Sequence, residues 1–538
     1  MFLQSYQAYR LSRFVPRLWL NRVYVALVVL HCWSTPLIRI VFKRRVVLSR
    51  LYLLLGAALL DLFSTIGLAV ILLTTYYKDY DPEIGGFPQS FWYNDEWVVN
   101  FFNEFHLVLV VSWIDLLNQI LFYTGIIGAM ENIKELLEQT RARARLQVGP
   151  TTTALATKEP SVGPVLRSNT LVTPPRHRFD RVAHTGLVIW GLVVLCLHVH
   201  GQTQQQLSQC LMQVRPWTAT RPACVLLSMD CSQANVLGHE DDITPLWEVA
   251  DPTAVTRIVI RHCPELRMPT ILQTFHRLDT LKLCNCTIVN WADSAAITNQ
   301  HHPVLTAIFV VRVNFPNGQL PPGMVSSDYP QSVYDSEFIV TNLRTLPDDL
   351  DTKWPHGGSI YIEMSQLEQF PSVLLRLEPT DLSLAVNHLT EFPVEAMQIP
   401  DMVFLSLAAN PISTLETIPY TDVVDNGVLA NLKLMETNVS SLPRWLDSLL
   451  DRGSPSQPSV NLHHSPFCWY VRELKNGTRL HFPAVDTTPE DELATVMLLS
   501  DVAAITQSVS CRYYFVTLYP LESEDEWSAL TPVDRPSK

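Results

Sequence analysis

MVFLSLAANPISTL, at residues 402–415, carries a pattern from which the fold of this chain can be inferred. The apolar positions of the segment are Met402, Leu405, Leu407, Ile412 and Leu415. Its two central leucines are separated by one residue, which is typical of a short strand with alternate side chains pointing to one side. Asn410 follows three places later and suits a turn, because its side chain can hydrogen-bond to nearby backbone groups. A segment this short cannot bury its apolar side alone, so its meaning depends on recurrence.

The pattern recurs about eight times between residues 255 and 460. The position of Asn410 is filled mostly by asparagine, cysteine, serine or threonine in the other copies, at residues 263, 286, about 313, 341, 365, 387 and 437. Steps of 22 to 28 residues are typical of leucine-rich repeats. Each copy would add one strand, and stacked copies would bury a continuous core. We therefore predict an α/β leucine-rich-repeat solenoid in this half of the chain.

From about residue 210 to residue 512 the chain resembles the extracellular leucine-rich-repeat domains of receptor-like membrane proteins. Such domains are capped, because terminal repeats otherwise expose the core. The stretch Leu462–Cys468 resembles a C-terminal cap, with Ser465 where the family usually has asparagine. We expect the acidic tail after this cap to be solvated. The implied parts are a cysteine-containing N-cap at 205–254, repeats at 255–460, a C-cap at 461–515 and the acidic tail at 516–538.

Eight of the ten cysteines lie between Cys210 and Cys511. Exposed free thiols are a liability outside the cell, so this distribution predicts disulfide bonds and an oxidising compartment. The candidates are Cys210, Cys224, Cys231, Cys468 and Cys511. The resemblance favours a Cys468–Cys511 bridge, whereas the N-cap set is incomplete and its pairing stays open. Cys263 and Cys286 occupy the inward turn position of the repeats, where we expect buried thiols.

Charge divides the chain near residue 200. Residues 1–199 contain 19 of the 39 basic residues and 13 of the 52 acidic residues, which leaves 20 basic and 39 acidic residues for the remainder. A basic half followed by an acidic half is typical of a chain whose halves lie on different sides of a membrane. The acidic half is a poor candidate for nucleic-acid binding, because phosphate contacts need clustered Lys and Arg.

Three apolar segments of the basic half suit membrane crossing. They are Leu51–Tyr77, Val98–Met130 and Val182–Val199. These segments predict two transmembrane helices with an acidic outer loop within 51–130, and a third transmembrane helix at 182–200. Asp61 and Asp115 lie within the first two segments, where charge is costly and usually faces a polar partner or a wet cavity. The two carboxylates are interpreted either as helix-packing contacts or as part of an ion path.

The segment 23–42 leaves the number of spans open. It lies within a basic N-terminal segment at 1–50, is apolar, and contains Pro36 and Arg39. Basic residues on both sides favour an interfacial or re-entrant segment. The alternative is a fourth span, which would place the N-terminus outside.

The basic loop at 131–181 is predicted to be cytoplasmic by the positive-inside rule. The acidic loop and everything after His200 then lie outside. The cytoplasmic loop is rich in Thr, Pro, Ser and Arg and has no apolar periodicity, so we expect disorder. Its polar part, about 40 residues, is too short for a catalytic domain. The sequence contains no P-loop, dinucleotide fingerprint, HExxH or GxSxG motif, so we predict no enzyme and no cofactor.

Three N-glycosylation sequons lie in the half assigned to the outside, at Asn285, Asn438 and Asn476. Each tripeptide alone is a weak signal. Asn285 lies between two cysteines near a strand, where the protein would sterically exclude a glycan.

The strand residues between the inward leucines are predicted to line the concave surface of the solenoid. The candidates for ligand contact are Lys282, Phe309, Tyr361, Glu363 and Lys433. Aromatic and charged side chains are suited to a contact patch. The alternative is that these side chains only solvate the sheet.

The predicted architecture favours a receptor-like or co-receptor protein at the plasma membrane. Its solenoid would bind a protein, peptide or glycan ligand outside the cell, and a membrane partner would signal. The second hypothesis is an adhesion or structural surface protein. The third is an accessory subunit of a transporter or channel, in which Asp61 and Asp115 would matter.

Overall fold

The computed structural model describes two compact units. The first contains residues 1–88, 100–205 and 214–220, and the second contains residues 89–99, 206–213 and 221–538. Within these bounds, the residues that the structure describes are 2–42, 45–106, 108–110, 112–147, 177–413, 415, 427–443, 446, 449–450, 459–479 and 509–528. Most of the loop predicted to be cytoplasmic and the last ten residues of the acidic tail lie outside this set.

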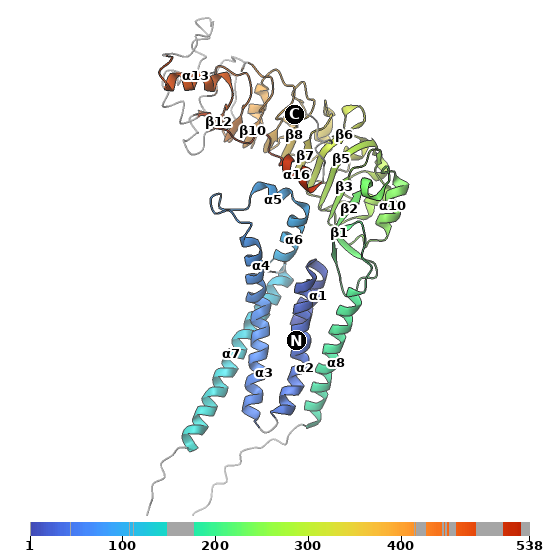
Figure 1. Ribbon diagram of the computed structural model, residues 1–538, viewed down its shortest axis with the longest axis vertical. Coiled ribbons are helices and arrows are strands. Elements are labelled where there is room, and N and C mark those ends of the chain that lie inside the picture. Colours follow the sequence, from blue (N-terminus) through green and yellow to red (C-terminus); the bar gives the residue numbers. More distant parts are fainter. Residues whose placement is uncertain are drawn as a thin grey trace, which may run out of the picture. The chain divides into compact units, whose positions relative to one another are not determined.

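The first unit is helical (Figure 1). Its helices are α1 (Phe2–Phe14), α2 (Leu18–Val41), α3 (Val46–Leu62), α4 (Leu68–Tyr77), the later part of α6 (Asp95–Phe105), α7 (Trp113–Gln147) and α8 (His177–Gln202), with a π-helical segment, Phe63–Gly67, between α3 and α4. α2 packs against α8, and α3 packs against α7. Their shared core includes Leu20, Tyr24 and Val194.

Four helices among the described residues are long and apolar enough to cross a membrane. They are Leu18–Val41, Val47–Tyr77, Trp113–Arg141 and Val182–Gln202. The segment 23–42, which we expected to be interfacial, lies in an unbroken helix despite Pro36. The segment predicted as one span over Val98–Met130 instead contains two helices, since α6 ends at Phe105 and α7 begins at Trp113. Ser112 and Asp115 explain the break, because each side chain bonds to the other's backbone N–H, as in a capping box.

The two carboxylates predicted within the spans have separate partners. Asp115 forms an ion pair with Arg10 at 2.7 Å, and both side chains are buried. Asp61 accepts a hydrogen bond from the Gln4 amide. Asp115 therefore joins α7 to α1, Asp61 joins α3 to α1, and this arrangement favours packing contacts over a shared ion path.

The second unit is a solenoid built on a parallel sheet (Figure 1). The strands, in chain order, are β1 (Cys210–Val214), β2 (Ala223–Asp230), β3 (Arg257–Arg261), β4 (Leu266–Arg267), β5 (Thr280–Asn290), β6 (Ala307–Asn314), β7 (Asp335–Ile339), β8 (Ser359–Glu363), β9 (Asp381–Ser383), β10 (Phe404–Ser406), β11 (Asn431–Lys433), β12 (Val460–Asn461) and β13 (Val509–Ser510). Strands follow one another across the sheet in chain order, apart from β4, which pairs only with β5. Every pairing from β2 to β13 is parallel.

Short helices connect these strands. They are α9 (Cys231–Ala234), α10 (Glu240–Glu248), α11 (Leu374–Leu377), α13 (Pro466–Lys475) and the 3₁₀ turns at Thr270–Thr274, Asp293–Ala295, Pro316–Gly318, Pro322–Met324, Leu350–Thr352 and Val394–Gln398. The inward leucines of the repeats, among them Leu281, Leu382 and Leu405, are fully buried in one continuous core. One strand per repeat, in register with its neighbours, is a leucine-rich-repeat-like architecture.

The turn after each strand repeats one backbone conformation. The residue just before the asparagine or cysteine position has a positive φ in repeat after repeat, for example 57° at His262, 56° at Val386 and 53° at Ala409. Asn410 then stabilises the turn through side-chain hydrogen bonds to the backbone. Its amide donates to the carbonyls of Leu384, Leu407 and Ala408, and its oxygen accepts from the N–H of Leu389.

Replacing Asn410 with alanine should therefore destabilise the solenoid by about 2 kcal/mol, because buried backbone groups of two repeats lose their partner. The free energy of unfolding of the second unit, measured by denaturant titration, tests this. Asn431→Ala, at an exposed position of β11, is the matched control and should change it by less than about 0.5 kcal/mol. An equal effect of both substitutions would contradict the role assigned to Asn410.

Three disulfide bonds staple the ends of the solenoid, Cys210–Cys224, Cys231–Cys263 and Cys468–Cys511. All five candidate cysteines are therefore bonded, and Cys468 has the partner that the resemblance favours. The expectation of a thiol at Cys263 is wrong, because this cysteine of the first repeat forms a disulfide bond with Cys231 of the N-cap. Cys286 is a buried thiol.

Candidate functional site

The sheet has a second face, opposite the leucine core, that carries charged and aromatic side chains. We call it the polar face and define it by Arg257, Lys282, Glu337, Glu363 and Lys433. Backbone register aligns its central row across the strands. The row runs Val259, Lys282, Phe309, Glu337, Tyr361, Ser383, Ser406 and Lys433.

Two segments of the same compact unit lie on this face. One is Gln89–Val99, which contains α5 (Gln89–Tyr93) and the start of α6. The other is Leu518–Ser528, which contains α16 (Leu521–Trp527). Both come from regions that the sequence analysis assigned elsewhere, the first to the loop between two spans and the second to a solvated tail.

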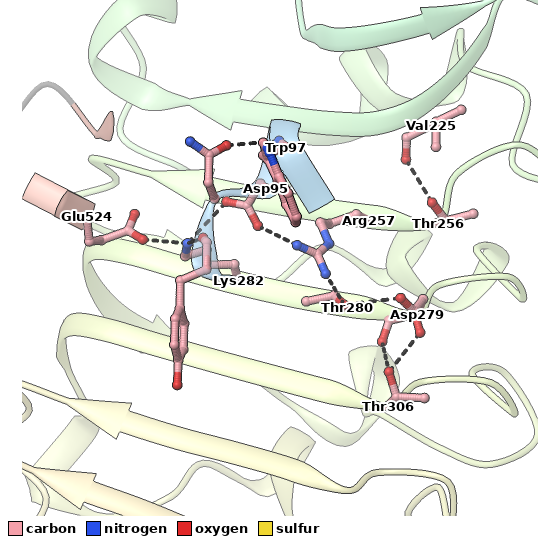
Figure 2. A network of polar contacts seen from close by, with 12 residues as sticks. Asp95, Trp97, Val225, Thr256, Arg257, Asp279, Thr280, Lys282, Thr306 and Glu524 are labelled. Carbon is pink, nitrogen blue, oxygen red and sulfur yellow. Dashed lines mark hydrogen bonds and ion pairs between the residues drawn. The ribbon is translucent and has the colours of Figure 1, made fainter. Parts of the chain in front are cut away.

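Asp95 lies among three cations of the polar face, Arg257, Lys282 and Arg261, of which Figure 2 shows the first two. It begins α6, where Asn94 caps the helix by accepting from the N–H of Trp97 at 3.0 Å. Its carboxylate lies 3.0 Å from Arg257 and 3.1 Å from Lys282. Burial alone would raise the pKa of Asp95, but these cations together hold it below its usual value. Asp95 is therefore a buried anion bound by a basic surface.

Lys282 joins the two segments, because its ammonium group has a carboxylate partner on each (Figure 2). Besides Asp95, it contacts Glu524 of α16 at 2.5 Å and donates to the carbonyl of Tyr93 at 3.0 Å. Its side chain is 1% exposed. Burial would lower the pKa of Lys282, but Asp95 and Glu524 raise it, so the group is a cation.

The second segment is bound through its remaining acidic and polar groups. Asp525 makes a bidentate pair with Arg312, with both N–H···O distances at 2.7 Å. The carbonyl of Ser528 contacts His262 Nε2 at 2.8 Å. Bidentate pairs between Arg and a carboxylate are among the stronger hydrogen-bonded contacts in proteins and fix orientation as well as distance. The acidic tail is thus not solvated here, since Glu524 and Asp525 are buried.

The middle of the polar face is acidic, and the same two segments offer it donors. Tyr93 donates its hydroxyl to Glu337 at 2.8 Å. Glu363 accepts the backbone N–H groups of Leu518 and Tyr519, at 2.9 Å and 3.3 Å. The two segments are therefore complementary to both parts of the face: their carboxylates meet its basic part, and their hydrogen-bond donors meet its acidic part.

Aromatic rings fill the space between these polar contacts. Tyr93 and Tyr519 meet edge to face, with centroids 4.7 Å apart, and Tyr93 also meets Phe309 at 5.7 Å. Such pairs contribute roughly 0.5–1.5 kcal/mol beyond their buried area. Leu521 and Trp527 pack on the same cluster.

Asp335 and Glu337, both on β7, lack donors for one oxygen each. Asp335 Oδ1 and Glu337 Oε2 are buried without a hydrogen-bond partner among the described atoms. Burial raises the pKa of Asp335 to about 7 and that of Glu337 well above its usual value. No group of three His, Cys, Asp or Glu in the described part of the chain is placed to hold a metal ion. Burial therefore favours the neutral form of both carboxyl groups.

All five residues predicted as candidates for ligand contact lie on the polar face, and most of them are covered by the same chain. Lys282, Phe309 and Glu363 are buried under the two segments. Tyr361 is half-buried. Lys433 is 8% exposed and lies over the rings of Phe404 and Tyr514.

Sequence reasoning missed Asp95, Tyr93, Tyr519 and Glu524, whose partners are 155 or more positions away. It also missed Glu337, although strand register places this residue between Phe309 and Tyr361.

The three sequon asparagines differ in exposure. Asn438 and Asn476 are exposed. Asn285 is half-buried, and its amide contacts His262 Nδ1 at 3.0 Å.

No family model matches the chain, and no curated protein matches its sequence. Among solved structures, the chain is similar to one from the Toll–Spatzle complex of Drosophila, with 16% identity and a TM-score of 0.30, over 45% of this chain and 34% of that one. An internalin from Listeria monocytogenes is 11% identical, with a TM-score of 0.27, over 39% of this chain and 62% of that one. A structure of the LRIM1/APL1C complex is 12% identical, with a TM-score of 0.28, over 40% of this chain and 46% of that one. The chain spans less than two thirds of each of these structures. The solenoid architecture instead follows from the parallel register of the strands and from the turn conformation that recurs after them.

Proposed function

We propose that this chain is a membrane-anchored leucine-rich-repeat protein whose solenoid lies outside the cell and binds a protein or peptide ligand, as a receptor-like or co-receptor protein. The observation that carries the proposal is the polar face, where buried charges and aromatic rings already hold two peptide segments. A surface with paired charges and edge-to-face aromatic rings has the composition of a binding hot spot.

The anchoring part of the proposal is supported by chain connectivity. Residues 89–99 and the solenoid form one compact unit, although α7 and α8 lie between them in the chain. If both helices cross the membrane, these two parts emerge on the same side, as one compact unit requires. The basic loop between α7 and α8 then lies on the cytoplasmic side, in agreement with the positive-inside rule.

The extracytoplasmic side is supported by covalent chemistry. Three disulfide bonds suit an oxidising compartment. Two exposed sequons lie in the same unit. Adhesion is the second candidate function, because a solenoid anchored at the cell surface could equally bind a structural polymer. Asp61 and Asp115 have separate partners, and this gives no support to the third candidate, an accessory role in transport.

Glycan mapping on intact cells tests the side of the membrane. We expect glycans at Asn438 and Asn476 and none at Asn285, whose amide is half-buried and bonded to His262. Glycosidase treatment of cells expressing the full chain should therefore increase its gel mobility. The step should halve in Asn438→Gln and in Asn476→Gln and stay unchanged in Asn285→Gln. A C-terminal domain that is protected from external protease and carries no glycan would contradict the proposal.

A further inference from the structure

The segment Leu518–Ser528 is held on the polar face in the manner of a bound peptide. Its ends contact different strands: Glu363 of β8 captures the N–H groups of Leu518 and Tyr519, and His262, after β3, contacts the Ser528 carbonyl. Between these ends, Glu524 and Asp525 face Lys282 and Arg312. Each interaction is a recognition contact between side chains or from a side chain to backbone, with no strand pairing to the solenoid.

The site requires acidic groups from whatever occupies it. Among the described residues, Arg312 would have no carboxylate partner without α16, and Lys282 would keep only Asp95. An occupant without acidic groups would bury these cations unpaired, which is costly, so the face favours an acidic occupant. The rings of Tyr93 and Phe309 add a requirement for an aromatic side chain at the position of Tyr519.

The described part of the tethered segment leaves one polar group of the site without a hydrogen-bond partner. Arg312 Nη1 is buried and has no hydrogen-bond partner among the described atoms. Arg312 and His262 also line a pocket of about 700 Å³, together with Asn285 and Asn314. A partner peptide that places a polar side chain in this pocket could supply an acceptor to Arg312 Nη1.

We propose that Leu518–Ser528 is a tethered ligand of the polar face, and that an acidic, aromatic helical peptide of a partner protein displaces it from Lys282 and Arg312. This proposal rests on the proposed function and names its ligand class. The segment acts as an intrinsic competitor, because its tether gives it a high effective concentration at the site. A partner peptide binds when it exceeds that competition, for example by also satisfying Arg312.

A cleavable full-length chain tests the proposal. A protease site inserted at the exposed stretch 513–515 leaves the Cys468–Cys511 bridge intact and, after cleavage, holds α16 by non-covalent contacts alone. A fluorescent peptide of residues 516–528 is then added to the purified chain in detergent. We expect the labelled peptide to exchange into the cleaved chain and to bind the uncleaved chain at least ~100-fold more weakly, since the tether competes.

Matched peptides separate recognition from simple charge attraction. The double change Glu524→Gln and Asp525→Asn should weaken binding by about 100-fold or more, because both buried pairs are lost. Glu526→Gln removes one charge from an exposed position of the same helix and should change affinity by less than about twofold. In the chain, Arg312→Ala should weaken the parent peptide strongly and the Asp525→Asn peptide little further.

Selection from a peptide display library against the cleaved chain tests the partner class. We expect winners with two adjacent acidic residues and an aromatic residue five positions before the first of them. A peptide that never exchanges, equal loss from Glu526→Gln and from the double change, or exchange of the segment only between copies to form dimers would overturn the proposal. The measurement uses purified protein and is independent of membrane side, so its failure is distinct from failure of the topology test.

Discussion

Substituting Lys282 with methionine should destabilise the covered polar face by about 3–5 kcal/mol, the cost of removing one partner from a buried ion pair. Methionine keeps most of the side-chain volume, so the loss arises from charge and not from a cavity. Glu524 would then keep only hydroxyl donors, from Tyr519 and Ser528, in a buried site. Asp95 would keep its two arginines, so the effect should concentrate on α16.

Cys284 provides a direct readout of this change. It is a buried free thiol on β5 that contacts the Ser528 hydroxyl at 3.3 Å, so a thiol reagent reaches it only when α16 leaves. The labelling rate of Cys284, resolved by peptide mapping, should rise by roughly 10² to several times 10³-fold in Lys282→Met, since each 1.4 kcal/mol is a factor of ten. Cys286, in the leucine core, reports global unfolding and should label slowly in both proteins.

Two further variants make the Lys282 prediction specific. Lys353→Met removes a lysine from a partly exposed surface pair with Asp349 and should change the Cys284 rate little, since exposed pairs contribute less than about 1 kcal/mol. Glu524→Gln added to Lys282→Met should recover part of the loss, because no carboxylate of α16 then faces the vacated position. A double variant as unstable as the single one would show that the charge pair is not the cause.

The second unit should lose stability as the pH rises from 5 to 8, and Asp335 should be a main cause. Its pKa is raised from 3.8 to about 7 by burial in the folded chain. The stabilisation gained from its neutral form is therefore complete below about pH 4 and is lost as the pH rises through about 7. A shift of this size corresponds to about 4 kcal/mol in all, of which about 3 kcal/mol falls between pH 5 and pH 8. Glu337, whose pKa burial also raises, acts in the same direction.

Asp335→Asn should flatten this pH profile and stabilise the chain at pH 8. The amide is neutral at every pH and can donate to Glu337 Oε2, which has no donor among the described atoms. Urea titrations of the second unit at pH 5 and pH 8 measure both effects. Asp241→Asn, at an exposed position of α10, should leave the profile unchanged. A variant at Asp335 that keeps the parent's slope between these pH values would remove this carboxyl from the explanation.

Asp95 also contributes to the pH dependence of stability, but at lower pH than Asp335. Three cations hold its pKa below the usual value after burial is overcome, so its stabilisation is present above the unfolded pKa and is lost on strong acidification. The carboxyl groups of Asp95 and Asp335 therefore act in opposite directions in different ranges. Between pH 5 and pH 8 Glu337 adds to the Asp335 effect, whereas His302, whose pKa burial lowers to about 4, opposes it. The Asp335 contribution is therefore the difference between the profiles of the parent and of Asp335→Asn.

The repeat architecture could be predicted from local sequence because its periodicity is local. Leucines two positions apart and an inward polar residue three places later specify a strand and a turn within a dozen residues. The same logic extends to the face: strand alternation alone placed Lys282, Phe309, Tyr361, Glu363 and Lys433 opposite the core. Cys263 was misassigned because its bonding depends on a partner 32 positions earlier, and no local signal distinguishes a buried thiol from a bridged one.

What covers the face could not be predicted from the sequence. Asp95 is 162 positions from Arg257, and Glu524 lies 242 positions after Lys282. In sequence both acidic stretches have the composition of solvated loops. Only folding brings them to the cations, and burial then makes each pairing far stronger than it would be in water.

The sequence by itself thus determined a capped stack of repeats, apolar helices before it, and the row of side chains on its polar face, because each depends on residues a few positions apart. Tertiary structure decided that Asp115 pairs with Arg10, that the acidic tail is a bound helix, and that the polar face is occupied by its own chain. Those outcomes depend on pairs of charged residues that are far apart in the sequence. The attraction within each pair becomes strong only when folding excludes water from between the two groups.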